Sequence, residues 1–554
     1  MTKEKIYHNP VISMDYSDPD AIRVGPDYYM TASSFNLVPG LPILHSRDLV
    51  HWELVNYALK AIPFERYDTP QPGCGVWAPA IRYHGGRYWI VFPMPDEGIF
   101  VTSTENPEGE WTEPFCIRKA VGWIDPCIFW DDDGKVYLIF AVARSRIGYN
   151  NVLQICELDP KTLQVRTEPV KVFEGVQHGQ TTVEGPKLYK REGWYYILAP
   201  AGGVKTGWQL AMRARNIYGS YEPKVVMAQG NTEINGPHQG ALVNDPYGRS
   251  WFLHFQDVYC LGRIVHLQPV RWQDGWPVIG SANENSVCGE PVTECVGPKE
   301  EKRDGKSSMQ ALLQYSPMSH YNDLFCRGIP AISWQWNANP KKGWSKVDDQ
   351  ERFFLNAVPV RKDQPIGDYA NLFLQKWPDE EFACRITANL SRLAEEELFG
   401  VISYGTSYFA ACMKREKDDL EIWQAAGTQI YGPVYQEQTK EKWQKIHSLP
   451  GFFHQETTNE NGRDVCLRYL VKTVGTRQIE NLPMPDEEVE ISLLDRQGWI
   501  RIGVFRAEPG RWIGSRMGMF CVAPGEEAAP CTGAAWIRSV KFYPIQSEDS
   551  EKDR

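Results

Sequence analysis

The stretch DPCIFWDDDGKVYLIF, from Asp125 to Phe140, decides the fold of this 554-residue chain. It consists of a short apolar strand, a turn of Asp and Gly, and a second strand rich in aromatic and β-branched residues. Four similar stretches occur in roughly the first 280 residues, where no convincing long amphipathic helix is found. They are DPDAIRVGPDYYM from Asp18, APAIRYHGGRYWIVF from Ala78, EGPKLYKREGWYYIL from Glu184 and HQGALVNDPYGRSWFLHF from His238. The repeats predict an all-β fold.

The spacing of the repeats narrows the architecture. Their first residues stand between 47 and 60 positions apart. A four-stranded propeller blade uses about 40–50 residues, so this spacing fits blades with some long loops. We therefore predict a five-bladed β-propeller over residues 1–285. A β-sandwich is the alternative, but it does not explain repetition at this period. In a propeller the innermost strands surround one axis, so equivalent positions converge at one end of it.

The second half of the chain has a different sequence pattern. Residues 286–322 are polar and charged and are predicted to be a linker. New β-patterns such as ISWQWNANP and NLFLQKW follow without the earlier period, and they predict a β-sandwich over residues 323–546. The end of the chain, residues 547–554, is predicted to be a frayed tail.

Composition excludes several classes of function. A formal net charge of −11 without a long basic run disfavours nucleic-acid binding. No stretch approaches 18 apolar residues, and the first residues lack the apolar region of a secretory signal, so we expect neither a membrane span nor export. The 13 cysteines are scattered, without a CxxC pair, which predicts thiols in a cytoplasmic protein. No nucleotide-binding glycine motif is present, so we expect no nucleotide or redox cofactor.

The residues that open the repeats have catalytic potential. Three of them are carboxylic acids, Asp18, Asp125 and Glu184, and a fourth is His238. Two carboxyl groups across a sugar can hydrolyse a glycosidic bond, one by protonating the leaving oxygen and the other by activating water. A third carboxylate nearby raises the pKa of the acid by like-charge repulsion. Asp-Pro also begins ordinary turns, and a histidine can simply fill a core. The equivalent positions of the acids in the repeats favour a site.

These segments resemble glycoside hydrolase family 43, the family of β-xylosidases and α-L-arabinofuranosidases. The likeness is carried, in the family's order, by NPVISMDYSDPDAIRVGPDYYMTASSF, GVWAPAIRY, WIDPCIFWDDDGKVYLIF, EGPKLYKREGWYYIL, GPHQGALV and LGRIVHLQPVRWQDGWP. The resemblance implies a five-bladed propeller and inversion at the anomeric carbon. It also implies that Asp18 is the general base, Glu184 the general acid and Asp125 the modulator of the acid's pKa.

The resemblance extends to a substrate-binding shell. Phe35, Trp77 and Ala78 match pocket-wall positions, and Arg263 matches an arginine that reaches the hydroxyls of the terminal sugar. His238 matches an axial histidine that lies beside a calcium ion in some members. No feature of the sequence requires calcium, so we expect no obligatory cofactor.

One loop departs from the family pattern. Many relatives have Gly-Gly-Thr after the acid, whereas this chain has Gly202, Gly203 and Val204. A hydroxyl that could face the substrate is missing there unless Thr206 replaces it. This departure leaves the sugar preference open.

The second half resembles the concanavalin-like jelly roll that follows the propeller in many xylosidase-like members. ISWQWNANP, NLFLQKW and GRWIGSRMGMF carry this likeness. In relatives the module closes part of the pocket, and Trp512 is the candidate residue that reaches toward it. The alternative is that Trp512 belongs to the core of the sandwich.

Together these observations predict an inverting, exo-acting β-1,4-xylosidase that acts on short xylo-oligosaccharides. An α-L-arabinofuranosidase or a bifunctional enzyme is the close alternative, because both substrates are pentosides. A non-catalytic carbohydrate-binding propeller is a remote alternative, whose signature would be the loss of an acid. The expected partner is a small oligosaccharide, with neither nucleic acid nor membrane, and a homo-oligomer stays open.

Overall fold

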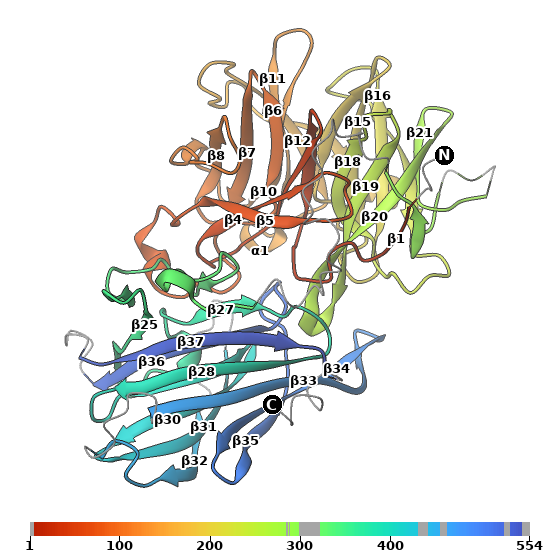
Figure 1. Ribbon diagram of the computed structural model, residues 1–554. Helices are drawn as coiled ribbons and strands as arrows, with labels where there is room; N and C mark the ends of the chain where they lie inside the picture. Colours follow the sequence, from red (N-terminus) through yellow and green to blue (C-terminus); the bar gives the residue numbers. More distant parts are fainter. Residues whose placement is uncertain are drawn as a thin grey trace, which may run out of the picture. The chain divides into compact units, whose positions relative to one another are not determined.

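The computed structural model describes residues 5–283, 286, 288–298, 322–429, 441–454, 463–525 and 532–545. The chain divides into two compact units, each built almost entirely of strands (Figure 1). The first, here the propeller unit, joins Met1–Pro63, Cys74–Asp257 and Arg263–Lys306. The second, here the sandwich unit, joins Phe64–Gly73, Val258–Gly262 and Ser307–Arg554.

The propeller unit contains five four-stranded antiparallel sheets, each in chain order, which confirms the predicted architecture. The first two blades are β2 (Asp20–Val24), β3 (Asp27–Thr31), β4 (Gly40–Ser46) and β5 (Glu53–Leu59), then β6 (Ala80–His84), β7 (Arg87–Met94), β8 (Gly98–Thr104) and β9 (Phe115–Arg118). The third is β10 (Trp123–Trp130), β11 (Val136–Val142), β12 (Val152–Leu158) and β13 (Val170–Glu174). The fourth and fifth are β14 (Lys187–Arg191), β15 (Trp194–Ala201), β16 (Trp208–Ala214) and β17 (Glu222–Ala228), then β18 (His238–Asn244), β19 (Ser250–Val258), β20 (Gly262–Gln273) and β21 (Trp276–Ile279).

The first strand of each blade faces the axis. Strand β2 lies beside β6 and β18, and β10 lies beside β6 and β14. The fourth and fifth blades meet through β15 and β18, so the five blades form a closed ring. Each predicted repeat is the hairpin of a blade's first two strands. In the second blade Gly85 and Gly86 form the turn at φ 59° and 79°, a conformation that suits the twist of a two-residue hairpin.

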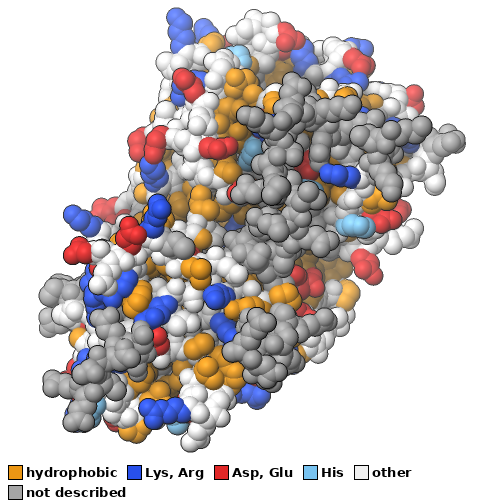
Figure 2. Space-filling model, in the orientation of Figure 1, with side chains coloured by type: hydrophobic (Ala, Val, Ile, Leu, Met, Phe, Trp, Pro, Cys, Tyr) orange, Lys and Arg blue, Asp and Glu red, His pale blue; other side chains and the backbone are white. Residues whose placement is uncertain are grey.

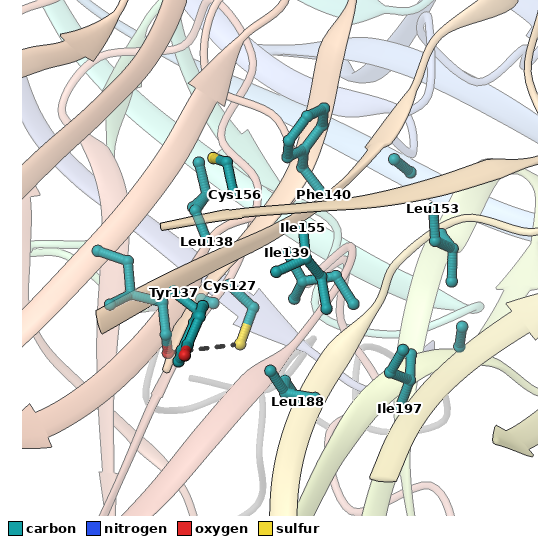
Figure 3. Packing of buried hydrophobic residues seen from close by; sticks show 14 of the residues in the cluster. Cys127, Tyr137, Leu138, Ile139, Phe140, Leu153, Ile155, Cys156, Leu188 and Ile197 are labelled. Carbon is teal, nitrogen blue, oxygen red and sulfur yellow. Dashed lines mark hydrogen bonds between the residues drawn. The ribbon is translucent and has the colours of Figure 1, made fainter. Parts of the chain in front are cut away.

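The blades are held by apolar packing between their faces (Figure 3). Ile139 and Phe140 of β11 and Ile155 of β12 are fully buried in one cluster that spans the second to fourth blades. Leu188 of β14 belongs to the same cluster. Truncating such a side chain to alanine typically costs about 2–5 kcal/mol. This packing fixes the inner strands, and therefore the residues at their ends.

The ends of the propeller unit are joined by strand pairing. β1 (Ile6–His8) pairs with β22 (Glu294–Val296), and Ile12 forms a bridge with Val265 of the fifth blade. The stretch that we predicted to be a linker therefore contains an ordered strand, β22, because the open edge of β1 offers backbone partners to it. Residues 299–321 of that stretch and the predicted tail lie outside the described residues.

The sandwich unit contains two sheets, as predicted for a β-sandwich. One has the order β23-β27-β36-β29-β30-β31-β32 with β26 beside β36, and the other has the order β24-β25-β37-β28-β33-β34-β35. The strands of the first sheet are β23 (Gln335–Trp336), β26 (Val358–Arg361), β27 (Phe373–Lys376), β29 (Leu398–Tyr404), β30 (Ser407–Glu416), β31 (Asp419–Thr428), β32 (Lys442–Leu449) and β36 (Arg516–Gly525). Those of the second are β24 (Ser345–Val347), β25 (Phe353–Asn356), β28 (Phe382–Arg392), β33 (Asp464–Ile479), β34 (Leu482–Asp495), β35 (Gly498–Arg506) and β37 (Ala534–Tyr543).

Helical segments in the described residues are short. They are α1 (Arg144–Ile147) and the 3-10 turns η1 (Glu65–Asp68), η2 (Gly175–His178), η3 (Tyr259–Leu261), η6 (Cys326–Gly328) and η7 (Ile366–Asp368). No helix in this part of the chain is long and apolar enough to cross a membrane. Basic and acidic side chains are intermingled over the face shown in Figure 2.

Two segments from the first half of the chain belong to the sandwich unit, so the division differs from the contiguous domains that we predicted. Asn339 donates a 3.2 Å hydrogen bond from Nδ2 to Oδ1 of Asp68. The Tyr259 hydroxyl donates a 2.6 Å hydrogen bond to Oε2 of Glu508. Such long-range partners leave no local pattern in either segment, which is why the sequence did not predict them.

Candidate active site

The three acids occupy equivalent places in three blades. Asp18 lies two residues before β2, Asp125 lies within β10 and Glu184 lies three residues before β14. Asp18 and Asp125 are buried and have φ of 56° and 54°. This left-handed conformation is uncommon for residues other than glycine and is enriched at functional sites. The geometry turns the chain sharply just where each carboxyl group meets the axis.

Asp125 has an unusual electrostatic environment. Burial, together with the negative charges of Glu184 and Asp18, raises the pKa of Asp125 to about 8. The backbone N–H of Gly185, 2.7 Å from Oδ2, and the Lys187 ammonium act in the opposite direction. This repulsion shows that the fold brings the three carboxyl groups into one electrostatic cluster.

Asp18 is held by two polar partners. The Ser33 hydroxyl donates a 2.5 Å hydrogen bond to Oδ2, and Nη1 of Arg263 lies 3.4 Å from Oδ1. Arg263 is itself buried, with its guanidinium 4.8 Å from the centre of the Phe255 ring and its Nε 3.8 Å from Oδ2 of Asp257. Both oxygens of the Asp18 carboxyl therefore have a fixed orientation.

Glu184 is the most accessible of the three acids, with its side chain 27% exposed. Its Oε1 lies 3.0 Å from Nε2 of His238, the first residue of β18, which is fully buried. The opposite ring nitrogen, Nδ1, is buried without a hydrogen-bond partner among the described residues. The structure thus places His238 beside the predicted acid, where it fixes the direction of the carboxyl group.

Two predicted wall residues come from segments that run side by side. Phe35 has φ 52°, and its backbone exchanges hydrogen bonds of 2.8 and 3.0 Å with Val76. A Cβ on Gly75 would lie 2.3 Å from the Phe35 carbonyl oxygen, so this approach requires glycine. Trp77 follows directly and is half-buried, with the Arg146 guanidinium 5.0 Å from its ring centre. The third wall residue, Ala78, is buried at the entry to the second blade.

Below the acids lies a belt with one polar group from each blade. Asp20 accepts a 2.6 Å hydrogen bond from Nη1 of Arg82, whose Nη2 lies 2.9 Å from Sγ of Cys127. The Arg82 guanidinium lies 5.7 Å from the Tyr189 ring centre, and the Tyr189 hydroxyl accepts a hydrogen bond from the Leu242 amide. Since Asp20 and Cys127 stand two residues after Asp18 and Asp125, strand alternation could have indicated this second layer.

The donors near His238 do not fit calcium. Calcium takes six to eight oxygen ligands, whereas His238 offers one imidazole nitrogen and its other nitrogen faces Glu184. Among the described residues, no group of three His, Cys, Asp or Glu side chains could hold a metal ion. We therefore derive no step through calcium.

Two further predicted positions are Trp512 and Thr206. Trp512, in the sandwich unit, is half-buried beside Gly73 of the same unit, at φ 63°. Its reach toward the acids stays a prediction. Thr206 donates a 3.3 Å hydrogen bond to the carbonyl of Gly202, so its hydroxyl is engaged within its own loop.

Comparison with known families agrees with the fold. The profile of glycosyl hydrolases family 43 matches residues 7–277, and that of the beta xylosidase C-terminal concanavalin A-like domain matches residues 322–536. This chain belongs to glycoside hydrolase family 43. The family hydrolyses glycosidic bonds with inversion, and the resemblance predicted from the sequence is confirmed.

Some relatives are named β-xylosidases and others α-L-arabinofuranosidases. A candidate β-xylosidase of Xylanibacter ruminicola is 40% identical over 357 residues, which cover 64% of this chain and 63% of the relative. A non-reducing end α-L-arabinofuranosidase of Bacteroides ovatus is 33% identical over 302 residues, which cover 50% and 54%. The chain thus matches less than two thirds of either relative. The crystal structure of a xylan β-1,4-xylosidase from Bacillus halodurans shares the fold, with a TM-score of 0.73, 19% identity and coverage of 97% and 99%.

Proposed function

We propose that this family 43 chain is an inverting, exo-acting hydrolase that releases terminal xylose from short xylo-oligosaccharides. The observation that carries the proposal is the convergence of Asp18, Asp125 and Glu184 at one end of the propeller axis. Their surroundings differ in the way that two-carboxylate hydrolysis needs. Asp18 has both oxygens fixed by Ser33 and Arg263, whereas Glu184 is more exposed and can meet a leaving oxygen.

The arrangement supports a division of roles. Asp18 and Glu184 come from the first and fourth blades, which are not neighbours in the ring. Such placement leaves room for a water molecule between the base and the anomeric carbon. Asp18 would draw a proton from this water while Glu184 protonates the bridging oxygen. Asp125 keeps a proton within the cluster, because its burial and its two acidic neighbours raise its pKa.

Xylose is the favoured sugar because the matched C-terminal domain is described as that of β-xylosidases. An α-L-arabinofuranosidase is the second candidate, supported by the name of the Bacteroides ovatus relative. The two substrates place similar hydroxyls around a five-carbon sugar, so one site can accept both. A panel of nitrophenyl β-xyloside, α-L-arabinofuranoside and β-glucoside separates these candidates by their kcat/KM values.

Xylobiose and xylohexaose test the mode of action. We expect complete conversion of xylobiose to xylose and stepwise shortening of xylohexaose by single residues. Early release of xylotriose from xylohexaose would contradict exo action. Tight binding of xylobiose without any xylose, from a folded protein, would favour the non-catalytic alternative instead. The cytoplasmic location stays a prediction of the sequence, and a homo-oligomer stays open.

A further inference from the structure

The fourth blade carries a lysine that is completely buried. Lys187 opens β14, three positions after Glu184, and its exposed fraction is 0%. Its Nζ donates a 3.3 Å hydrogen bond to the carbonyl oxygen of Pro79. Burying an ammonium is costly unless hydrogen bonds or an opposite charge compensate for it. A single carbonyl satisfies one of three N–H donors, so an anion nearby must supply much of the compensation.

The path of the Lys187 side chain leads across the axis. Lys187 belongs to the fourth blade, whereas Pro79 directly precedes β6 of the second blade, and the third blade stands between them. Along β14, Lys187 shares a strand face with Tyr189, whose ring contacts Arg82 of the second blade. Leu188 points the other way, into the core shared with the third blade. The ammonium therefore lies on the axial side of β10, the strand that carries Asp125.

Asp125 is the acidic group on that side of the axis. Gly185, two residues before Lys187, donates its backbone N–H to Oδ2 of Asp125, so the segment that carries the lysine is fastened to this carboxyl group. Lys187 is also the cation that attracts Asp125 electrostatically.

Other charged and titratable groups around the cluster are already engaged with one another. Arg82 pairs with Asp20 and also contacts Cys127 and Tyr189. Arg263 pairs with Asp18. His238 contacts Glu184. The residues that make these contacts belong to all five blades. Among the described residues, Lys187 is thus the buried cation left to act on Asp125.

We propose that Lys187 is a positioning residue that supplies the counter-charge of the acid trio and so sets the pH at which the trio loses its last proton. The proposal rests on the proposed hydrolase function. General acid catalysis ends when that proton leaves, so the basic limb of the pH–rate profile reports it. A neighbouring positive charge favours loss of the proton, and removing the charge should delay this loss to higher pH.

The test compares two neutral variants with a matched control. Lys187→Met removes the charge at nearly constant side-chain volume. Lys187→Gln removes the charge but keeps a hydrogen-bond donor for the Pro79 carbonyl. It therefore serves as the second neutral variant if Lys187→Met does not fold. Lys190→Met is the control on the same strand, where Nζ pairs with Asp131 and Asp132 away from the trio. We expect the basic limb of kcat/KM for xylobiose, whose leaving group needs the acid, to shift to higher pH by roughly one unit in both neutral variants. The limb should stay in place in Lys190→Met.

A second readout does not depend on turnover. Carbon-13 NMR of aspartate-labelled protein follows the Asp125 carboxyl, assigned by its absence from Asp125→Asn. In Lys187→Gln its titration should move to higher pH by a similar amount. Folded neutral variants with an unmoved limb and an unmoved titration would overturn the role of Lys187. An inactive wild-type protein whose Asp125 titration still responds to Lys187→Gln would contradict the proposed function and leave the charge relationship standing.

Discussion

The backbone N–H of Gly185 donates a 2.7 Å hydrogen bond to Oδ2 of Asp125. Since Gly185 directly follows Glu184, the carboxyl group of the third blade is fastened to the residue next to the predicted acid. Asp125 therefore acts on Glu184 through backbone position as well as through charge. Gly185 has φ 57°, and a Cβ there would lie 2.8 Å from the Gln239 side chain, so the link depends on glycine.

Asp125→Asn should make the protein more stable at alkaline pH. The folded-state pKa of Asp125 is raised to about 8, above its usual value of about 3.9 in an unfolded chain. The stability that the folded protein has while this carboxyl is neutral is therefore fully present below pH 4. It is lost as the pH rises through about 8, where the buried carboxyl must ionise. Asparagine stays neutral at every pH. We therefore expect the melting temperature of the Asp125→Asn variant at pH 9 to exceed that of wild type by a few degrees. This difference in melting temperature between the variant and wild type should become steadily smaller as the pH is lowered toward 4.

Activity gives the counterpart measurement for the same variant. Removing a like charge from the trio should move the basic limb of kcat/KM to lower pH, with a marked fall in kcat. Parallel melting curves for the two proteins from pH 4 to 9, with an unmoved limb, would remove Asp125 from the coupled cluster.

Glu184→Gln should discriminate between leaving groups. A sugar leaving group needs a proton, so turnover of xylobiose should fall by about 10²–10⁴-fold. Nitrophenolate leaves without much assistance, so nitrophenyl xyloside should suffer far less. Asp18→Asn is the comparison, because water needs its base with either substrate and both rates should fall together. Equal losses in Glu184→Gln on the two substrates would contradict its role as the acid.

Ser33→Ala tests the support of the base. The variant removes the 2.5 Å hydrogen bond to Oδ2 of Asp18, so the carboxyl group should lose its fixed orientation. We expect kcat to fall by roughly tenfold with little change in KM. Ser34→Ala is the matched control, since its Oγ accepts the Leu41 amide and does not touch the acids. Identical rates in the two variants would show that the Ser33 contact does not matter for turnover.

The acids were predictable because they open repeats, whereas their supports were not. Asp18, Asp125 and Glu184 hold equivalent positions, and the repeat period alone places such positions at one end of the axis. Ser33 follows the second strand of its blade, outside the repeated opening residues. Lys187 stands in KLYK, which reads as an ordinary strand with solvated lysines, and Lys190 of the same run is indeed partly exposed. Only the closing of the ring buries one lysine and leaves the other outside.

Arg263→Lys should lose activity without losing the fold. The guanidinium lies against the Phe255 ring and reaches both Asp18 and Asp257, which a planar fork can do and a single ammonium cannot. We expect at least a tenfold loss of kcat/KM, and a melting temperature within a few degrees of wild type. Kinetics like those of wild type would show that the arginine is only structural.

The stereochemical course tests the mechanism as a whole. In an inverting enzyme, water must fit between the base and the anomeric carbon, so the two carboxyl groups stand roughly 6.5–9.5 Å apart, against about 5–5.5 Å when one of them attacks the sugar directly. Asp18 and Glu184 belong to blades that are not neighbours in the ring, which favours the wider separation. The shorter Asp side chain leaves space for water, and the longer Glu side chain can reach the bridging oxygen.

Single displacement by water then follows, without a glycosyl-enzyme intermediate. Proton NMR during the first minutes of β-xyloside hydrolysis should show α-xylose first, and β-xylose should grow in only by mutarotation. Methanol added at molar concentration should yield no methyl β-xyloside, because a retaining enzyme would transfer its covalent intermediate to the alcohol. Initial β-xylose would overturn single displacement even if all three acids proved essential. In that case Asp18 would have to approach the anomeric carbon itself, which its bonds to Ser33 and Arg263 oppose.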